Sequence, residues 1–180
     1  MKRMNAVVLC VLIGVGAGLL IAGSESPLET VRNVNLARYV GLWYEIARYP
    51  NRFERKCDHD VTAEYSVKAD GDIRVVNTCI TQAGKSTQSV GTAKVVDSST
   101  HAKLKVSFFW PFYGKYWIID LGENYEYAVV GEPSREYLWI LSRTPEMQES
   151  VYQGILGLLA AKGYEAQKLL KTARAGSTKP

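Results

Sequence analysis

Between residues 42 and 142 the sequence alternates short apolar runs with clusters of turn-forming residues. The runs span 42–48, 60–67, 72–79, 88–96, 102–110, 115–121, 125–131 and 136–142. Runs of this length, separated by Gly-, Asp-, Asn- and Ser-containing connections, predict β-strands joined by tight turns. The connections are too short to hold crossover helices, so the pattern predicts an antiparallel barrel or sandwich.

The clearest turn is "ADGD" at 69–72, where Asp70-Gly71 supplies the positive φ angles of a tight hairpin. Cys57 precedes the first strand of this hairpin and Cys79 ends the second, so both lie at its open end. Simple pairing leaves the two cysteines a few residues out of alignment, and a bulge or bend must close that gap. We expect a Cys57–Cys79 disulfide, because an even pair in an exported chain is typical of one. Two buried free thiols are the alternative.

The faces of the later strands follow from their alternation. In 104–110 one face, expected to point inward, carries Leu104, Val106, Phe108 and Trp110. The run 136–142 is apolar on both faces, so it is expected to be covered on both sides.

After this run the period changes to that of a helix. Thr144 is a candidate N-cap and Pro145 suits the first turn. Apolar residues then recur at helical spacing, before Gly163 ends the helix, at Met147, Val151, Ile155 and Leu158. This stripe is expected to cover the outer face of 136–142.

The N-terminus has the form of a bacterial export signal. Lys2 and Arg3 precede an uncharged, mostly apolar run over 6–23, followed by small residues. Ser24 stands where a bacterial lipoprotein would carry its lipid-modified cysteine, so lipid anchoring is not expected. We therefore expect residues 1–24 to be a signal peptide or a retained anchor, 25–172 to be one domain, and 173–180 to be a disordered tail. The expected location is the periplasm or outer membrane.

Composition excludes several classes of function. The net charge of +4 falls to near +2 without Lys2 and Arg3, which is too weak for nucleic-acid binding. His59 and His101 are distant from each other and show no metal-ligand spacing with the cysteines, so no metal or cofactor is expected. Haem carriage would need an inward histidine, which the sequence does not clearly offer. No catalytic set stands at a telling spacing, and Glu45, the one acid that alternation turns inward, is expected to pair with an arginine.

Two separated motifs resemble the signatures of the lipocalin family. The first is "GLWY" with Gly41 and Trp43, and the second is "LSRTP" with Arg143, just past the last predicted strand. Further segments, "NRFER", "VTAEYSV" and "LKVSFFWPFYGKYWII", are similar to bacterial outer-membrane lipocalins. The family's middle Thr-Asp-Tyr signature is replaced here by "GENYEY".

The resemblance implies an all-β fold, an eight-stranded antiparallel up-and-down barrel with a C-terminal helix packed on its outside. It also implies that Trp43 plugs the closed end, that Arg143 lies across its ring, and that Gly41 lets the chain pass closely beneath. A guanidinium over an indole stabilises by roughly 0.5–2 kcal/mol.

The resemblance further implies a cavity that binds a fatty acid or lysophospholipid, for storage or transport in maintenance of the cell envelope. The residues expected to line this cavity are Ala47, Ala63, Tyr65, Val75, Asn77, Ala93, Val106, Phe108, Trp139 and Leu141. Of these, Tyr65 and Asn77 are expected near the rim, where they could meet a polar head group.

An alternative function is that of an interaction module with a packed barrel. The segment "FFWPFYG" at 108–114 is unusually aromatic for a connection between strands. It is either a plug over the turn or an exposed patch that meets a membrane or a second copy of the chain.

Overall fold

A computed structural model describes residues 26–176 of the chain. All eight predicted strands are present: β1 (Gly41–Arg48), β2 (Cys57–Val67), β3 (Ile73–Thr81), β4 (Ser86–Val95), β5 (Lys103–Phe109), β6 (Phe112–Leu121), β7 (Tyr127–Gly131) and β8 (Leu138–Ser142). A short helix α1 (Leu36–Tyr39) precedes them, and they are followed by α2 (Glu149–Ala161), the 3-10 turn η1 (Ala166–Lys168) and a short β9 (Leu170–Lys171). The predicted leader at 1–24 lies outside the described residues.

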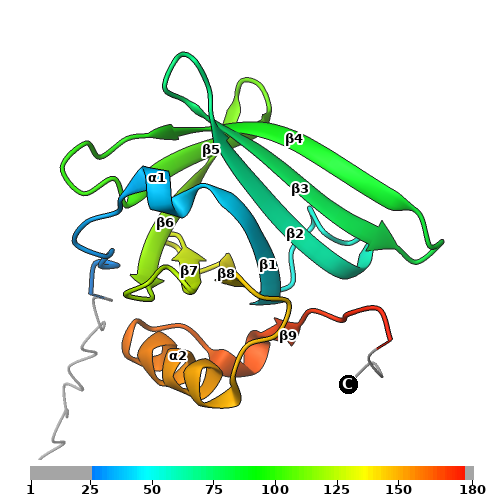
Figure 1. Ribbon diagram of the computed structural model, residues 1–180. Helices are drawn as coiled ribbons and strands as arrows, with labels where there is room; N and C mark the ends of the chain where they lie inside the picture. The colour runs from blue at the N-terminus through cyan, green and yellow to red at the C-terminus, as the bar shows by residue number, and fades with distance from the viewer. Residues whose placement is uncertain (1–25, 177–180) are drawn as a thin grey trace, which may run out of the picture.

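The strands close into a barrel, which settles the choice between barrel and sandwich. From β2 to β8 each strand pairs antiparallel with the next, β8 pairs with β1, and β1 pairs back to β2 (Figure 1). The predicted hairpin turn is confirmed, with Gly71 at φ +84°. We call the end that carries α1 and the start of β1 the floor, and the opposite end, where β1 ends and the 49–56 loop follows, the mouth.

The disulfide between Cys57 and Cys79 is present, with a Cα–Cα distance of 5.6 Å. Two register shifts in the β2–β3 pairing, one between Cys57 and His59 and one between His59 and Thr62, bring the two cysteines together. The predicted irregularity is therefore confirmed.

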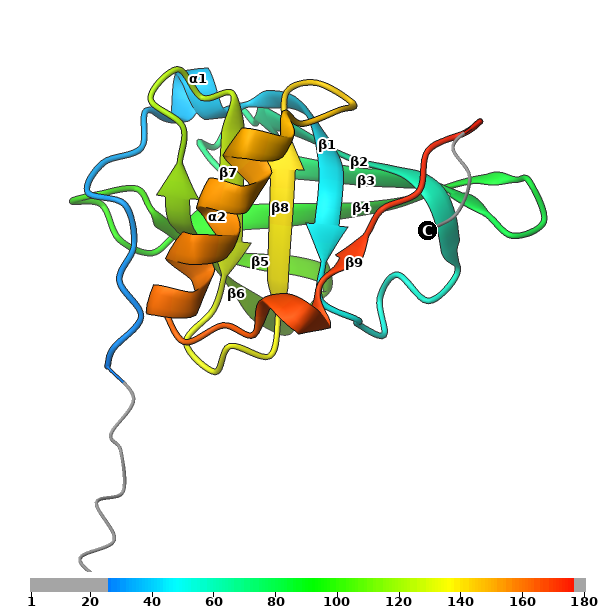
Figure 2. The same cartoon turned by 90° about the horizontal axis from the view of Figure 1, so that it is seen from below.

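Helix α2 lies across the outer face of β7 and β8 (Figure 2). It covers Leu138 and Ile140, as predicted, but it begins at Glu149 rather than at Thr144. The Thr144 hydroxyl donates to the Glu146 carbonyl at 2.6 Å instead of accepting from a helix N–H. The buried face is also offset from the predicted stripe, and consists of Tyr152, Ile155 and Leu159.

The described residues after β9 lie against the barrel, at the start of the segment 173–180 that the sequence assigns to the tail. β1 pairs with β2 over 41–44 and with β9 farther along, and the chain after β9 runs between the two strands. The N–H of Thr172 donates to Ile46, and Ala173 accepts from the N–H of Asp60 at 3.0 Å. The C-terminal segment thus closes the seam that β1 and β2 leave near the mouth.

Candidate functional site

Trp43 forms the floor of the barrel and is fully buried. Its indole N–H donates to the Tyr39 carbonyl at 2.8 Å, and the Arg143 guanidinium lies 3.7 Å from the ring centre. Both polar and aromatic parts of the side chain are therefore partnered, as a buried tryptophan requires.

Arg143 also ties the floor together through backbone carbonyls. Nη1 donates to Leu42 at 2.9 Å, Nη2 reaches the carbonyls of residues 38–40, and Nε reaches Tyr125. Gly41 has φ +99°, and a Cβ at this position would lie 3.4 Å from Arg143 Nη1. A positive φ and the close guanidinium together explain a glycine here. Trp43, Arg143 and Gly41 thus stand at the closed end, where the resemblance put them.

Beside Trp43, three phenols form a hydrogen-bonded cluster, in which the Tyr39 ring centre lies 5.2 Å from that of Trp43. The Tyr116 hydroxyl shares hydrogen bonds with Tyr39 at 2.7 Å and with Tyr65 at 2.9 Å. Burial raises the pKa of all three, that of Tyr65 to about 12, so the hydroxyls stay neutral. Since Tyr65 and Tyr116 belong to β2 and β6, this cluster bridges the barrel interior.

The inner wall of the barrel is mainly apolar and includes small side chains. Most of the residues predicted to line a cavity belong to this inner cluster or face it from the same strand positions: Ala63, Tyr65, Val75, Ala93, Val106, Trp139 and Leu141. Leu104 on β5 and Leu141 on β8 are 3% and 4% exposed, whereas Val106 and Trp139, two residues nearer the mouth on the same strands, are half-buried. Accessibility therefore increases from the floor toward the mouth.

Two of the predicted positions are wrong. Ala47 lies in the outer cluster beneath α2, because a bulge between Glu45 and Ala47 reverses the alternation of β1. Tyr65 pairs with Gly41 near the floor, with its hydroxyl bound to Tyr116, and so does not stand at the rim.

Asn77 and Phe108 lie nearer the mouth. Asn77 is paired with Ser89, and its Oδ1 is buried without a hydrogen-bond partner in residues 26–176. A buried carbonyl oxygen of this kind can accept a hydrogen bond from a polar group of a ligand. Phe108 is 43% exposed, and its ring lies against Gly91.

A charged cluster that the sequence predicts only in part lines the mouth. Arg48 Nη1 donates to Glu45 at 2.9 Å, which confirms the expected pairing of Glu45 with an arginine. Glu54, from the loop between β1 and β2, accepts from the Trp139 indole N–H at 2.8 Å and lies 3.1 Å from Arg48 Nε. Strict alternation along β1 would put the Arg48 side chain outside the barrel, and the bulge turns it inward. For Glu54, the only signal in the sequence was the resemblance of "NRFER" to bacterial lipocalins.

The aromatic segment at 108–114 lies at the mouth between β5 and β6 and is exposed rather than plugging the turn. Phe109, Trp110 and Phe112 are 75%, 78% and 70% exposed. Trp110, predicted to point inward, is therefore wrongly assigned.

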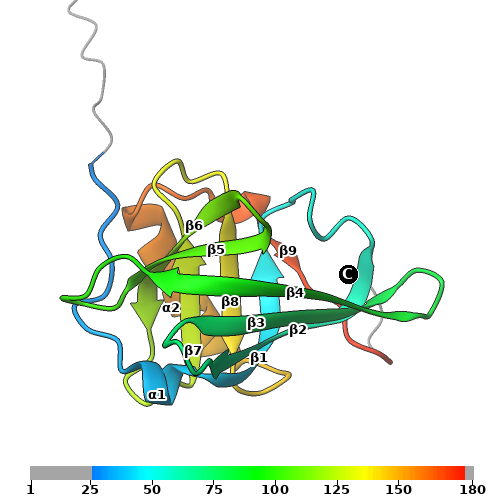
Figure 3. The same ribbon diagram turned by 90° about the horizontal axis from the view of Figure 1, so that it is seen from above.

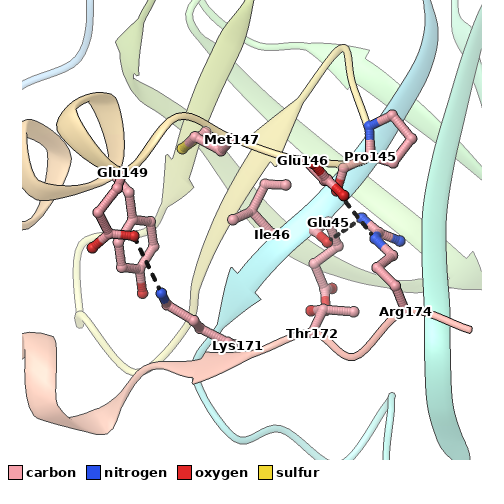
Figure 4. A pocket seen from close by; sticks show the side chains of 10 residues that line it. Glu45, Ile46, Pro145, Glu146, Met147, Glu149, Lys171, Thr172 and Arg174 are labelled. Atoms are coloured by element: carbon pink, nitrogen blue, oxygen red, sulfur yellow. Dashed lines mark hydrogen bonds and ion pairs between the residues drawn. The ribbon is translucent and has the colours of Figure 1, made fainter. Parts of the chain in front are cut away.

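Two pockets lie on the outer wall. One, of about 280 Å³, is bounded by Ile46 and Met147 and by the C-terminal segment, where Lys171 pairs with Glu149 and Arg174 donates to the Glu45 carbonyl (Figure 4). The second, of about 420 Å³, lies over β4 and β5, on the side of the barrel away from α2 (Figure 3). Ion pairs line both, such as Lys94 with Asp72 in the second.

Within residues 26–176, no group of three or more His, Cys, Asp or Glu side chains is placed to hold a metal ion. In the same part of the chain, no helix has both the length and the apolar character needed to cross a bilayer.

A closed eight-stranded antiparallel barrel, with an indole and a guanidinium at one end and a helix on its wall, defines a small calyx-shaped protein. The family model described as a lipocalin-like domain matches residues 34–174. The chain belongs to the lipocalin family, whose members bind small hydrophobic ligands.

Individual proteins and a solved structure are also similar to this chain. The chain is 41% identical over 167 residues to the outer membrane lipoprotein Blc of Escherichia coli K12, covering 89% of this chain and 94% of that protein. It is 32% identical over 153 residues to mouse apolipoprotein D, covering 79% and 78% of the two chains. The solved structure of insecticyanin from Manduca sexta superposes with a TM-score of 0.69 at 18% identity, covering 84% and 87% of the chains, which shows the fold alone.

We expect Arg143→Lys to lower the free energy of unfolding by about 2 kcal/mol or more, because lysine keeps the charge but loses the planar fork that reaches several carbonyls. Urea unfolding measures this. Arg32→Lys, at an exposed position, is the control and should stay within about 0.5 kcal/mol of the unsubstituted protein. Equal effects of the two substitutions would show that charge alone holds the floor.

We expect Glu45 to make stability depend on pH. Burial, followed by the nearby Glu54, raises the pKa of Glu45 above its ordinary value, against the opposing effect of Arg48. The folded state therefore binds the proton more tightly than the unfolded chain. This stabilisation is complete below about pH 4.5, the ordinary value, and is lost as pH rises through the raised pKa.

Thermal unfolding between about pH 5 and pH 8 tests this expectation. As pH rises, the melting temperature of the unsubstituted protein should fall relative to that of Glu45→Gln. Glu64→Gln, at an exposed position of β2, should leave the pH profile unchanged. Parallel profiles for the unsubstituted protein and Glu45→Gln would contradict the expectation.

Proposed function

We propose that this protein is a non-enzymatic carrier that binds a single-chain lipid, a fatty acid or a lysophospholipid, in the upper half of its barrel. The observation that carries the proposal is that the solvent exposure of the inner-wall side chains increases toward the mouth. Leu104 and Leu141 are buried in the inner wall, and Val106 and Trp139, nearer the mouth on the same two strands, are half-buried. A largely apolar site with a few polar groups suits an elongated hydrophobic ligand.

The chemistry of the described residues supports binding rather than catalysis. Cys57 and Cys79 are joined to each other, so neither supplies a nucleophilic thiol. The hydroxyls of Tyr39, Tyr65 and Tyr116 are bonded to one another, and burial raises their pKa values. The relatives are named as lipoproteins and lipocalins and not as enzymes.

We propose that the carrier acts in the bacterial cell envelope, storing or transporting lipid there. Relatives from Escherichia coli, Citrobacter freundii and Vibrio cholerae are named outer membrane lipoproteins. The basic and apolar leader supports export, and Ser24 in place of a cysteine argues for a soluble periplasmic form or for retention through the leader.

Displacement of a fluorescent fatty acid tests the binding site. Val106→Trp places a large side chain in the upper interior and should weaken binding at least tenfold. Lys105→Trp adds the same ring on the outward face of the same strand and should bind within about twofold of the unsubstituted protein. Equal binding by both variants would place the lipid outside the barrel, and absence of binding or of co-purified lipid would contradict the carrier proposal.

A second candidate function rests on the exposed aromatic mouth. Phe109, Trp110 and Phe112 present large apolar rings beside the outward lysines Lys105 and Lys115. Aromatic rings favour the interface of a bilayer, and lysines are attracted to anionic head groups. This combination supports contact between the mouth and a membrane, with or without lipid exchange; a second copy of the chain is the competing partner.

Co-sedimentation with vesicles containing an anionic phospholipid tests this contact. Trp110→Ser combined with Phe112→Ser should reduce vesicle binding at least fivefold while leaving the melting temperature nearly unchanged, because the rings are exposed. Val96→Ser, at an exposed apolar residue that follows β4 near the floor, is the control. Unchanged vesicle binding, or a dimer that the double substitution dissociates, would contradict a membrane role.

A further inference from the structure

Arg48 places a cation in the inner wall of the barrel, close to the mouth. It pairs across the sheet with Trp139, which belongs to the inner wall, and its guanidinium meets two carboxylates, those of Glu45 and Glu54. The arginine side chain is only 15% exposed. A partly buried guanidinium beside an apolar inner wall is suited to bind an anionic group.

The second of these carboxylates reaches the barrel on a loop. Asn51 turns the loop by accepting from the N–H groups of Phe53 and Glu54 at 3.0 Å. Glu54 then points inward to Trp139, whereas the adjacent Phe53 is 58% exposed. The loop therefore holds an acidic side chain at the mouth, against Arg48 and Trp139 of two neighbouring strands.

The contact between Arg48 and Glu54 is incomplete. Arg48 Nε and Glu54 Oε2 lie 3.1 Å apart and both are buried, yet neither makes a well-directed hydrogen bond to any described residue. Buried polar atoms without such bonds weaken the arrangement that holds them. Glu54 Oε1 accepts from the Trp139 indole at 2.8 Å and from the Asn51 amide at 3.2 Å, and Glu45 is bonded to Arg48 at 2.9 Å and to the Thr172 hydroxyl. Glu45 stands on β1 with a side chain that is 3% exposed, whereas Glu54 stands on a loop with a side chain that is 14% exposed. Of the two acids, Glu54 is thus the one that a ligand can displace.

We propose that Arg48 receives the anionic head of a single-chain amphiphile, and that Glu54 is an internal competitor which the ligand's anion displaces. This inference rests on the proposed carrier function and adds the class of head group. The exchange replaces one carboxylate by another anion, so the net charge around Arg48 is unchanged. The displaced Glu54 moves with its loop toward water, which solvates it. The acyl chain extends below Arg48 toward Asn77 and Val106.

The two substitutions have opposite expected effects. Glu54→Gln removes the competing charge and should raise affinity for a C16 fatty acid about tenfold. Arg48→Gln removes the guanidinium that binds the anion and should lower this affinity about tenfold, as expected for loss of one charge-assisted contact. The C16 alcohol has the same chain without the anion, so its affinity should change less than threefold in both variants. The controls are Arg52→Gln and Glu136→Gln, which remove exposed charges from loops at the mouth.

Displacement of an uncharged fluorescent lipid measures all of these affinities, and circular dichroism monitors folding. The deciding quantity is the affinity for the fatty acid divided by the affinity for the alcohol. The proposal is supported if this ratio rises more than threefold in Glu54→Gln and falls more than threefold in Arg48→Gln. A smaller or opposite change in Glu54→Gln overturns it, even if Arg48→Gln fails to fold. Running lysophosphatidic acid beside the fatty acid shows whether phosphate or carboxylate is preferred. If neither acid nor alcohol binds to any form of the protein, the carrier function itself fails.

Discussion

The stack of the Arg143 guanidinium on the Trp43 indole is the contact on which the barrel's shape depends. It joins the start of β1 to the segment that follows β8, and its remaining donors reach the carbonyls of 38–40, Leu42 and Tyr125. Several carbonyls converge on one planar cation, which also covers the buried Trp43 ring, so this end of the barrel is closed. A ligand can then approach the interior only from the opposite end, where the mouth loops lie.

The polarity of the barrel interior changes from the floor to the mouth. The phenols near the floor, bonded through Tyr116, satisfy one another's hydroxyls. An apolar zone follows, and charge reappears at Arg48 near the mouth. A fatty acid has the same order, with an apolar tail and a charged head. On the outside, α2 and the C-terminal segment cover the wall and close the seam between β1 and β2, which isolates the inner surface from the outer one.

Much of this fold is predictable because period-two alternation and tight turns are local signals. The eight strands, the hairpin at Gly71 and the covering of β8 on both faces all follow from them. The family motifs supplied the floor. Two of the errors come from local irregularities that change the positions of the residues after them. The one-residue bulge in β1 sends Ala47 outward and Arg48 inward. Likewise, the Thr144 hydroxyl is used within its own turn, which delays α2 to Glu149. Long-range contacts, such as Glu54 with Trp139, have no local signature.

Whether a lipid chain occupies the barrel interior can be measured directly by nuclear magnetic resonance with a nitroxide-labelled fatty acid and methyl-labelled protein. If the chain lies inside, the methyl signals of Val106, Val75 and Leu141 broaden as the lipid is added, while those of Ile155 and Leu159 beneath α2 stay sharp. Broadening confined to Ile46 and Met147, which border the outer pocket, with the inner methyls unaffected, would contradict a ligand-filled barrel.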